Sequence, residues 1–265
     1  MDLFKQSLAP IPTEAWAEIN DRAKEVILSQ LTARGVLNVV GPKGLAANSI
    51  TQGRLKPIKD MKKGEVGASL YDVVPLMETR IEFDLARWEL DNILRGEKDA
   101  ELDNLEDAAE KLAFFEEDAI YNGHKAAGIK GLNEVAGTRL KLTKDPNDIL
   151  KAVSKGANTL NNAYTKRPYD MIVSDEVLQR LNQMYQGGLL RKNVEVIIGG
   201  DVIRSRVIKG AFLIPRDHED LELTLGQDYS VGYEAHDSKN IKLFLMNSFT
   251  FRCLDEDIVV AFDLE

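Results

Sequence analysis

The residue types that most often carry catalysis or bind metal ions are few and scattered in this sequence. The three histidines, His124, His218 and His236, are spaced too widely to place two ligands on one helix face. The single cysteine, Cys253, excludes an internal disulfide and a cysteine-rich metal site. Cys253 lies in the largely apolar run of residues 249–254, so we expect its side chain to be a small, buried part of the core. We therefore expect neither a metal site nor a catalytic cysteine.

Motifs that bind phosphate or activate a serine are also absent from the sequence. It contains no glycine-rich loop of the P-loop or dinucleotide type and no Gly-x-Ser-x-Gly turn. The tripeptide His218-Glu219-Asp220 has ligand-type side chains, but its position after Pro215 and before an apolar run favours a polar surface turn. Carboxylates are abundant, and a sequence alone cannot single out a pair for acid–base catalysis. We therefore expect no catalytic residues and no bound cofactor, and the chain is not predicted to be an enzyme.

Composition places this chain of 265 residues among globular proteins, with 44% hydrophobic and 29% charged residues. Its length suits one large domain or two closely joined ones. The net charge of −9 disfavours a general attraction to nucleic acid. No window reaches the roughly 18 apolar residues that span a bilayer, and the N-terminal residues lack the pattern of a secretion signal. We expect a cytoplasmic protein that binds neither membranes nor specific nucleic acid.

Apolar residues at three- and four-residue spacing predict two long helices in the first half of the chain. The first spans residues 13–34, with Thr13 as its N-cap and Gly35 as a left-handed C-cap. The second spans residues 102–122, is ended by Gly123 and buries one apolar face. Its acidic residues are expected to coat the opposite, solvent-facing side. They are Glu106, Asp107, Glu110, Glu116, Glu117 and Asp118.

The second half of the chain is predicted to hold two further helices and most of the strands. Asp145 is the expected N-cap of a helix at residues 146–163, and another helix is expected at residues 175–185. Runs rich in β-branched and aromatic residues predict strands. The expected strands are residues 81–85, 169–173, 194–198, 202–208, 211–214, 221–225, 229–234, 241–251 and 258–262. Because helices come first and mostly antiparallel strands follow, the chain is predicted to be an α+β protein.

Residues 41–67 differ in character from the rest of the chain. Five glycines and two prolines interrupt any long helix there, and short extended stretches suggest a long hairpin. Its lysines concentrate positive charge on an otherwise acidic chain. They are Lys56, Lys59, Lys62 and Lys63. Two interpretations fit: a solvated, charged loop, or an arm that reaches an acidic neighbouring subunit.

Several separated blocks of the sequence form a pattern found in one protein family. They are residues 8–11, 16–19, 41–44, 75–80, 83–92, 128–132, 225–233 and 248–251. Their order, and their spread over nearly the whole chain, resemble the encapsulins, the shell proteins of bacterial nanocompartments. Asn38 departs from the acidic residue found there in some relatives, which weakens any charge pairing with a basic cargo tail.

The resemblance implies the fold of tailed-phage major capsid proteins, the Hong Kong 97-like fold. A subunit of that fold consists of a peripheral domain, an axial domain and an extended arm. The N-terminal helix and the start of the peripheral domain would occupy residues 1–48, and the arm residues 49–69. The peripheral domain with its long helix would occupy residues 70–136, the axial domain residues 137–215, and the C-terminal strands of the peripheral domain residues 216–265.

The same resemblance implies self-assembly into a closed icosahedral shell of about 60 copies. Such shells enclose peroxidases or ferritin-like enzymes that carry a short C-terminal targeting peptide. The peptide is expected to dock on Val26, Ile27, Leu31, Arg34, Leu37, Val39, Val231 and Tyr233. A pore is expected to be lined by Tyr185, Gln186, Gly187, Gly188, Leu189, Leu190, Arg191 and Lys192. The four lysines of the arm would contact a neighbouring subunit, and Trp88 could stack a flavin at a subunit surface.

Two alternatives remain open from the sequence. A phage major capsid protein would share the fold but package DNA, and the acidic net charge and the block at residues 225–233 favour the encapsulin instead. A secreted bacteriocin or protease, a label this family has carried, belongs to another class of function. The missing export signal and the missing nucleophile motif count against it.

Overall fold

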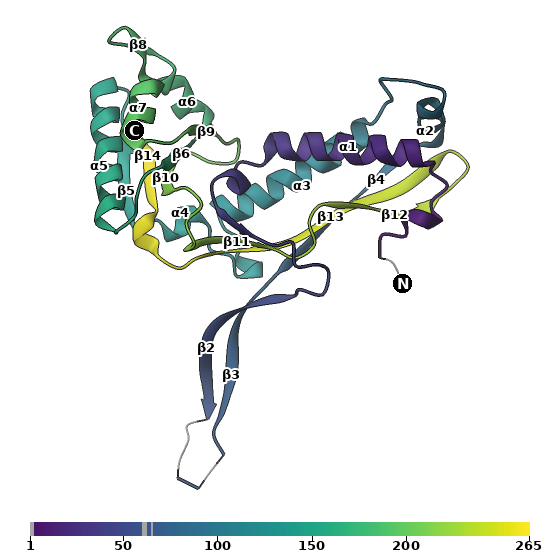
Figure 1. The fold of residues 1–265 in the computed structure, drawn as a ribbon, viewed down its shortest axis with the longest axis horizontal. Helices are drawn as coiled ribbons and strands as arrows, with labels where there is room; N and C mark the ends of the chain where they lie inside the picture. The colour runs from purple at the N-terminus through teal and green to yellow at the C-terminus, as the bar shows by residue number, and fades with distance from the viewer. Residues whose placement is uncertain (1–2, 60–62, 65) are drawn as a thin grey trace.

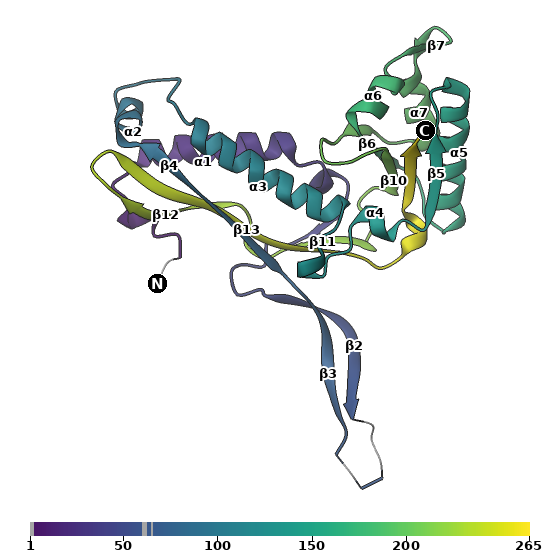
Figure 2. The same cartoon turned by 180° about the vertical axis from the view of Figure 1, so that it is seen from behind.

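The computed structural model describes residues 3–59, 63–64 and 66–265. It shows an elongated body with two hydrophobic cores, one at each end, and a long hairpin that projects away from the body (Figure 1). The same hairpin stands clear of both ends of the body from behind (Figure 2). The chain thus forms three parts, two cores and a hairpin.

The first core lies between a sheet and two long helices that cover one of its faces (Figure 1). The helices are α1 (Thr13–Gln30) and α3 (Asp103–Tyr121). The sheet contains β1 (Asn38–Val40), β11 (Leu221–Leu225), β13 (Asn240–Cys253), β12 (Ser230–His236) and β4 (Met77–Ala86). Strand β13 is central and pairs antiparallel with β4, β11 and β12. Helix α2 (Arg87–Leu94) follows β4 at the far end.

The second core surrounds a sheet of five strands with the order β5-β14-β10-β6-β9. These strands are β5 (Thr138–Leu142), β6 (Tyr169–Val173), β9 (Val202–Arg204), β10 (Ala211–Pro215) and β14 (Val260–Leu264). The helices around it are α4 (Leu132–Val135), α5 (Pro146–Asn162), α6 (Asp175–Leu181) and α7 (Leu190–Ile198). A short hairpin of β7 (Met184–Tyr185) and β8 (Gly188–Leu189) forms the tip of this end (Figures 1 and 2).

The projecting hairpin consists of β2 (Ser49–Lys59) and β3 (Ala68–Pro75), and we call it the arm. Almost every described residue of β2 is exposed, and Gly53, with a φ of +68°, lies where the pairing register shifts. Large apolar side chains on the arm face solvent, including Leu55, Ile58 and Tyr71, the last 78% exposed. A two-stranded hairpin is only marginally stable in water, so packing against another surface would stabilise the arm.

Most predicted helices are confirmed. Asp145 caps α5 by accepting hydrogen bonds from the backbone N–H groups of Asn147 and Asp148, at 2.9 and 3.1 Å. Gly123 follows the end of α3 with a φ of +89°, which suits glycine. The predicted helix at 175–185 ends earlier, at Leu181, and the chain then forms the β7–β8 hairpin.

The first helix begins at Thr13 as predicted, but its N-cap and its C-terminal end were predicted wrongly. Pro12, not Thr13, is the N-cap, and the helix stops at Gln30 instead of continuing to a left-handed Gly35. The early stop has a physical cause in α3. The buried carboxylate of Glu117 accepts the backbone N–H groups of Thr32 and Ala33, at 2.9 and 2.8 Å, so these groups leave the helix for a side-chain acceptor.

The predicted strand at residues 194–198 is also wrong, because these residues belong to helix α7. Leu190, Val194 and Ile198 follow one another at four-residue spacing and are fully buried, whereas Val196 is 78% exposed. One buried helical face has therefore outweighed the strand preference of four β-branched residues. The strand predicted at 202–208 is shorter than expected, because β9 ends at Arg204 and the chain then bends.

The implied domain boundaries need one correction. Strand β14 was assigned with the C-terminal strands of the peripheral domain, but it pairs with β5 and β10 in the sheet of the second core. The chain thus crosses to that end again after β13. Cys253, expected to be buried, is partly exposed, and its thiol donates to the carbonyl of Asp255 at 3.1 Å. Burial raises the pKa of this thiol to about 12, which agrees with an unreactive role.

Candidate binding pocket

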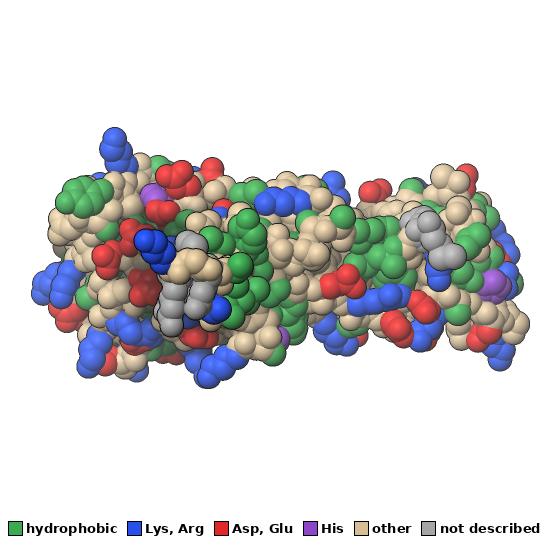
Figure 3. Space-filling view, turned by 90° about the horizontal axis from the view of Figure 1, so that it is seen from below, with side chains coloured by type: hydrophobic (Ala, Val, Ile, Leu, Met, Phe, Trp, Pro, Cys, Tyr) green, Lys and Arg blue, Asp and Glu red, His purple; other side chains and the backbone are tan. Residues whose placement is uncertain are grey.

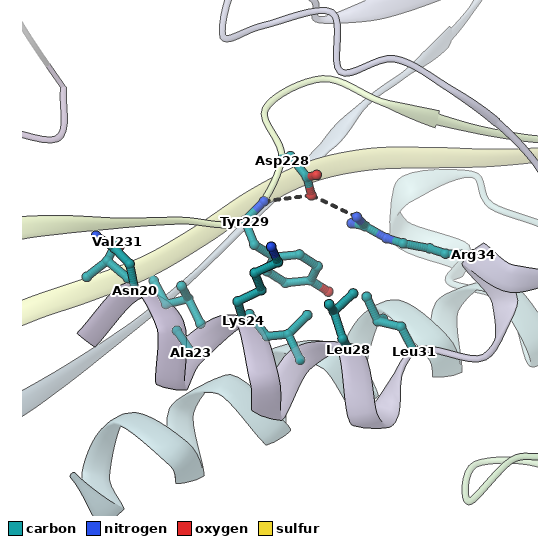
Figure 4. A pocket seen from close by; sticks show the side chains of 11 residues that line it. Asn20, Ala23, Lys24, Leu28, Leu31, Arg34, Asp228, Tyr229 and Val231 are labelled. Atoms are coloured by element: carbon teal, nitrogen blue, oxygen red, sulfur yellow. Dashed lines mark hydrogen bonds and ion pairs between the residues drawn. The ribbon is translucent and has the colours of Figure 1, made fainter. Parts of the chain in front are cut away.

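A pocket of about 290 Å³ lies between helix α1 and the sheet, where the chain enters β12 (Figure 4). One side comes from α1 and the turn after it. The other side comes from the residues before β12, from β12 and from β13. The lining residues are Asn20, Ala23, Lys24, Ile27, Leu28, Leu31, Arg34, Asp228, Tyr229, Val231 and Leu245.

The middle of the pocket is apolar. Ile27 lies in the last turn of α1, and Leu31 follows directly after the helix ends at Gln30; both side chains line the pocket. Val231 and Leu245 approach from the sheet, where they are neighbours in adjacent strands. Leu28 lies at the rim and is 60% exposed. Such a surface suits an apolar side chain of a partner better than a polar substrate.

One end of the pocket is closed by an ion pair that Figure 4 shows from close by. The Arg34 guanidinium donates to Asp228 Oδ1 at 2.7 Å and to both carboxylate oxygens of Glu116, at 2.7 and 2.9 Å. It also lies over the ring of Tyr229, with Cζ 4.8 Å from the centroid. Burial alone would lower the pKa of Arg34, but its hydrogen bonds to Glu116 and Asp228 raise it above the ordinary value.

Glu116 is fully buried beneath this end wall and has donors on every side. Besides Arg34, its Oε2 accepts the Tyr229 hydroxyl at 2.9 Å and the Asn247 amide at 2.6 Å. Burial, followed by the charge of Glu116, raises the pKa of Tyr229 well above its usual range. One carboxylate of α3 therefore joins the turn after α1, the start of β12 and strand β13.

Glu117 is the next residue on α3 and is also buried, with 1% exposure. It accepts two backbone N–H groups from the turn after α1 and the hydroxyl of Thr32, which in turn is 2.8 Å from the Tyr121 hydroxyl. Burial raises the pKa of Glu117 to about 7 against the effect of these hydrogen bonds, and the neighbouring charge of Glu116 adds to the rise. The prediction that Glu116 and Glu117 face solvent was therefore wrong.

The structure places half of the predicted docking residues in this pocket. Ile27, Leu31, Arg34 and Val231 line it. The other four predicted residues do not line the pocket, because each packs in or against one of the two hydrophobic cores. Val26 and Tyr233 pack on the first core outside the pocket, Leu37 is buried in the second core, and Val39 packs against that core.

Sequence reasoning missed several lining residues. Leu28 and Lys24 lie at the helical spacing that had identified Ile27 and Leu31, so they could have been predicted from the sequence. Asp228 and Tyr229 come from a segment about 190 residues away in sequence, and only the fold brings them beside Arg34. No local pattern could have found that pair.

The predicted pore segment forms the β7–β8 hairpin and the first turn of α7. Gln186 and Gly187 are at its exposed tip, with φ values of 48° and 84°. The Tyr185 hydroxyl donates to Asn147 Oδ1 at 2.6 Å, and Arg191 donates to Glu195 at 2.7 Å. Leu190 must be removed from the predicted lining, since its side chain is fully buried in the second core.

The remaining residues of the predicted pore lining are partly or fully exposed. Gly188 is partly exposed and lies in β8, Leu189 is exposed, and Lys192 is exposed on the first turn of α7. These residues belong to the far tip of the molecule (Figure 2).

The lysines of the arm do not form one free cationic patch. Lys56 pairs within the arm with Asp72 at 2.7 Å. Lys59 and Lys63 are exposed, and Lys62 lies outside the described residues. Figure 3, which looks along the arm from its tip, shows apolar side chains next to the charged ones on this side of the molecule.

The described part of the chain shows neither a candidate metal site nor a candidate membrane-spanning helix. No group of three histidine, cysteine or acidic residues there could hold a metal ion. No described helix has the length and apolar character to cross a membrane. Trp88 is exposed on α2, and the Arg95 guanidinium lies 4.7 Å from its ring centroid, so one face of the ring has a partner within the subunit.

Comparison with known proteins gives the family of the chain and the type of its fold. A family model described as "Encapsulating protein for peroxidase" matches residues 1–250. The type 1 encapsulin shell protein of Mycolicibacterium paratuberculosis is 32% identical over 98% of both chains. The virus-like particle from Pyrococcus furiosus has a similar structure, with a TM-score of 0.69 and 14% identity over 95% of this chain and all of the other.

A phage protein shares the fold at lower similarity. The capsid of Myoviridae Phage XM1 gives a TM-score of 0.58 at 12% identity, covering 86% of this chain and 89% of the other. At this identity the likeness shows the fold alone. The predicted capsid fold is therefore confirmed.

Proposed function

This chain belongs to the encapsulating-protein family, and from that membership we propose that it is the shell subunit of an encapsulin nanocompartment. The observation that carries the proposal is the family match over residues 1–250, together with a full-length relative at 32% identity. The same membership supports a structural role in a shell, and we propose that the subunit itself does not catalyse a reaction. The expected assembly is a closed icosahedron of about 60 copies.

Self-assembly is supported by the surfaces that one subunit leaves without a partner. The arm exposes Leu55, Ile58 and Leu70, each 58–63% accessible. Strand β4 pairs on one side with β13 and has no second neighbouring strand among the described residues. Both features are unfavourable in an isolated molecule and become favourable when copies cover one another. We propose that the arm, including its lysines, contacts a neighbouring subunit.

The pocket beside α1 is the proposed dock for a cargo protein. Its apolar centre and polar end wall suit an extended segment that inserts one or two apolar side chains and leaves its backbone near Asp228 and Lys24. In this proposal the segment is the C-terminal targeting peptide of a peroxidase or a ferritin-like enzyme. The shell would lie in the cytoplasm, which cell fractionation would test.

The β7–β8 hairpin is the proposed rim of a pore. It is a narrow tip at one end of the subunit, and its polar, glycine-containing turn suits a place where several copies meet around an axis. Tyr185, Gln186, Gly187 and Gly188 are the residues proposed to approach that axis, with Leu189, Arg191 and Lys192 beside them.

Electron microscopy of the purified protein tests the proposal. Hollow particles of one diameter, with other proteins inside, are the expected result. A monomer or a small oligomer at the same protein concentration would overturn the shell assignment. Particles filled with nucleic acid would overturn it in favour of a phage-like capsid.

A further inference from the structure

The end wall of the pocket is built on two consecutive buried carboxylates with different surroundings. Glu116 is bound by the cation Arg34, by a phenol and by an amide. Glu117 is bound only by neutral donors, and no cationic side chain pairs with it among the residues that the structure describes. The positive charge of Arg34 is already shared between Glu116 and Asp228. A negative charge on Glu117 is therefore not compensated.

The groups that face Glu117 come from three segments. On α3 itself they are Glu116 and Tyr121, and from the turn after α1 they are the hydroxyl and N–H of Thr32 and the N–H of Ala33. Tyr229 approaches from the start of β12. None of these groups carries positive charge, so ionisation of Glu117 adds a second buried anion next to Glu116.

We propose that Glu117 is the positioning residue for the end wall of the pocket, and that its protonation controls how firmly the turn at residues 31–34 is held. When Glu117 is protonated, its O–H donates to the Thr32 hydroxyl in place of accepting from it, and the other carboxyl oxygen still accepts the two N–H groups, so the turn is fixed. The ionised carboxylate favours exposure to water, and the turn opens to give it that exposure.

The consequence for the pocket follows from the sequence of the turn. Leu31 and Arg34 lie at its two ends, and both line the pocket. When the turn opens, the apolar side chain and the guanidinium lose their fixed positions together. The affinity of the pocket for an inserted apolar segment then falls. This consequence rests on the proposed function of the pocket as a dock, whereas the opening of the turn does not.

The direction of the pH effect follows from linkage. The pKa of Glu117 is raised from 4.5 to about 7 when the turn is closed, and an opened, hydrated Glu117 would return toward 4.5. Opening therefore releases a proton, and the opening equilibrium rises by up to about tenfold per pH unit between those two pKa values. Above pH 7 both forms are ionised, so the equilibrium levels off. The turn is held most firmly at the acid end of this range.

Hydrogen–deuterium exchange measured by mass spectrometry tests this on the purified full-length protein, with no cargo needed. Wild type is compared with Glu117→Gln, whose amide keeps both acceptor and donor roles but cannot ionise. At each pH the same amides have the same intrinsic exchange rate in both proteins, so the ratio of their rates reports the opening equilibrium. The peptide to follow covers residues 31–37.

The expected ratio of wild-type to E117Q exchange rises between pH 5 and 7 by up to about tenfold per unit and then becomes flat. Glu110→Gln is the matched control, since Glu110 lies on the same helix but pairs at the surface with Arg206 at 3.0 Å. E110Q should follow wild type at every pH. A wild-type to E117Q ratio that stays within about twofold over this range would overturn the proposal.

Wild-type protein alone also gives an answer if E117Q does not fold. Protection factors for residues 31–37 are then corrected for intrinsic exchange and compared with those of the buried residues 243–249 in β13. A fall confined to the turn between pH 5 and 7 supports the proposal, and equal behaviour of both segments refutes it. Either result is independent of whether particles form or contain cargo, so failure here is distinct from failure of the shell assignment.

Discussion

Removing the charge of Arg34 offers a quantitative test of the buried network under the pocket. In Arg34→Met the methionine keeps much of the side-chain length but leaves Glu116, which has no exposed surface, without its cation. Breaking one side of a buried ion pair costs about 3–5 kcal/mol in the free energy of unfolding, because the remaining charge stays desolvated. For a chain of this size that loss corresponds to a fall of about 5–10 °C in the unfolding midpoint.

The double variant separates this explanation from a simple loss of packing. In R34M/E116Q the side chain at position 116 is also neutral, while its amide oxygen can still accept hydrogen bonds from Tyr229 and Asn247. We expect the double variant to recover most of the lost stability and to lie within about 1–2 kcal/mol of wild type. Thermal unfolding of wild type, R34M, E116Q and R34M/E116Q at one protein concentration and pH 8 completes this double-mutant cycle. A double variant as unstable as R34M would refute the charge argument.

The control for this cycle is an exposed ion pair of similar length. Arg139 and Asp263 are 2.6 Å apart in the second sheet, with side chains 44% and 50% exposed. Exposed pairs contribute at most about 1 kcal/mol, so Arg139→Met should change the midpoint by no more than about 2 °C. A loss as large as that of R34M would show that burial is not the deciding factor.

Four further outcomes are expected. Gly232→Ala should destabilise the subunit by about 1–3 kcal/mol in thermal unfolding, because an added Cβ would clash with the ring of the buried Phe244; an unchanged midpoint would contradict this packing. Leu28→Asp should lower the amount of co-purified cargo, quantified by mass spectrometry, by about tenfold or more, since a charge at the rim of an apolar pocket must be desolvated on binding; wild-type loading would remove the pocket from the docking role. Replacing residues 53–70 with a short Gly-Ser turn should abolish particles seen by electron microscopy while leaving a folded monomer, because the arm lies outside both cores; intact particles would show that the arm is dispensable. Glu117→Gln should be more stable than wild type at pH 8 by up to about 3 kcal/mol in thermal unfolding, because a carboxyl with a raised pKa stabilises the folded state below pH 4.5 and loses that contribution as the pH rises through about 7; equal stability at pH 5 and pH 8 relative to wild type would contradict the raised pKa.

Two of these variants have close controls within the chain. Gly35→Ala should be neutral or nearly so, because no atom lies within 4 Å of an added Cβ and its φ is not in the left-handed region. Val196→Asp places the same charge on a site of α7 that is 78% exposed, and cargo loading should not change. A loss of loading in V196D would mean that charge anywhere on the subunit disturbs docking.

Helix positions could be predicted well because their causes are local. The four-residue spacing of Ile19, Ala23 and Ile27 is visible in the sequence and is the buried face of α1 in the structure. The Asp145-Pro146 pair marks the start of α5 for reasons confined to one turn. The capsid fold itself came from the resemblance of separated blocks, since composition and periodicity indicated only an α+β protein.

Strand assignments failed where a tertiary partner decided the outcome. Residues 194–198 have the β-branched composition of a strand, yet they extend the face begun by Leu190 and pack against α5 and β6 as a helix. Strand β14 was assigned to the wrong sheet because its partners, β5 and β10, lie about 50 to 120 residues earlier. Local composition contains no information about either choice.

The acidic residues of α3 show most clearly why the site could not be predicted. In the sequence Glu116 and Glu117 look like Asp107 and Asp118, which do face solvent. Burying a carboxylate is unfavourable unless hydrogen-bond donors surround it in the folded chain. The donors to Glu116 come from segments 82 to 131 residues away. The same long-range donors give the two residues different tasks, since one meets a cation and the other only neutral groups. A helix pattern can therefore locate the scaffold of the pocket, but which of its charges is fixed and which can titrate is decided only when the chain has folded around them.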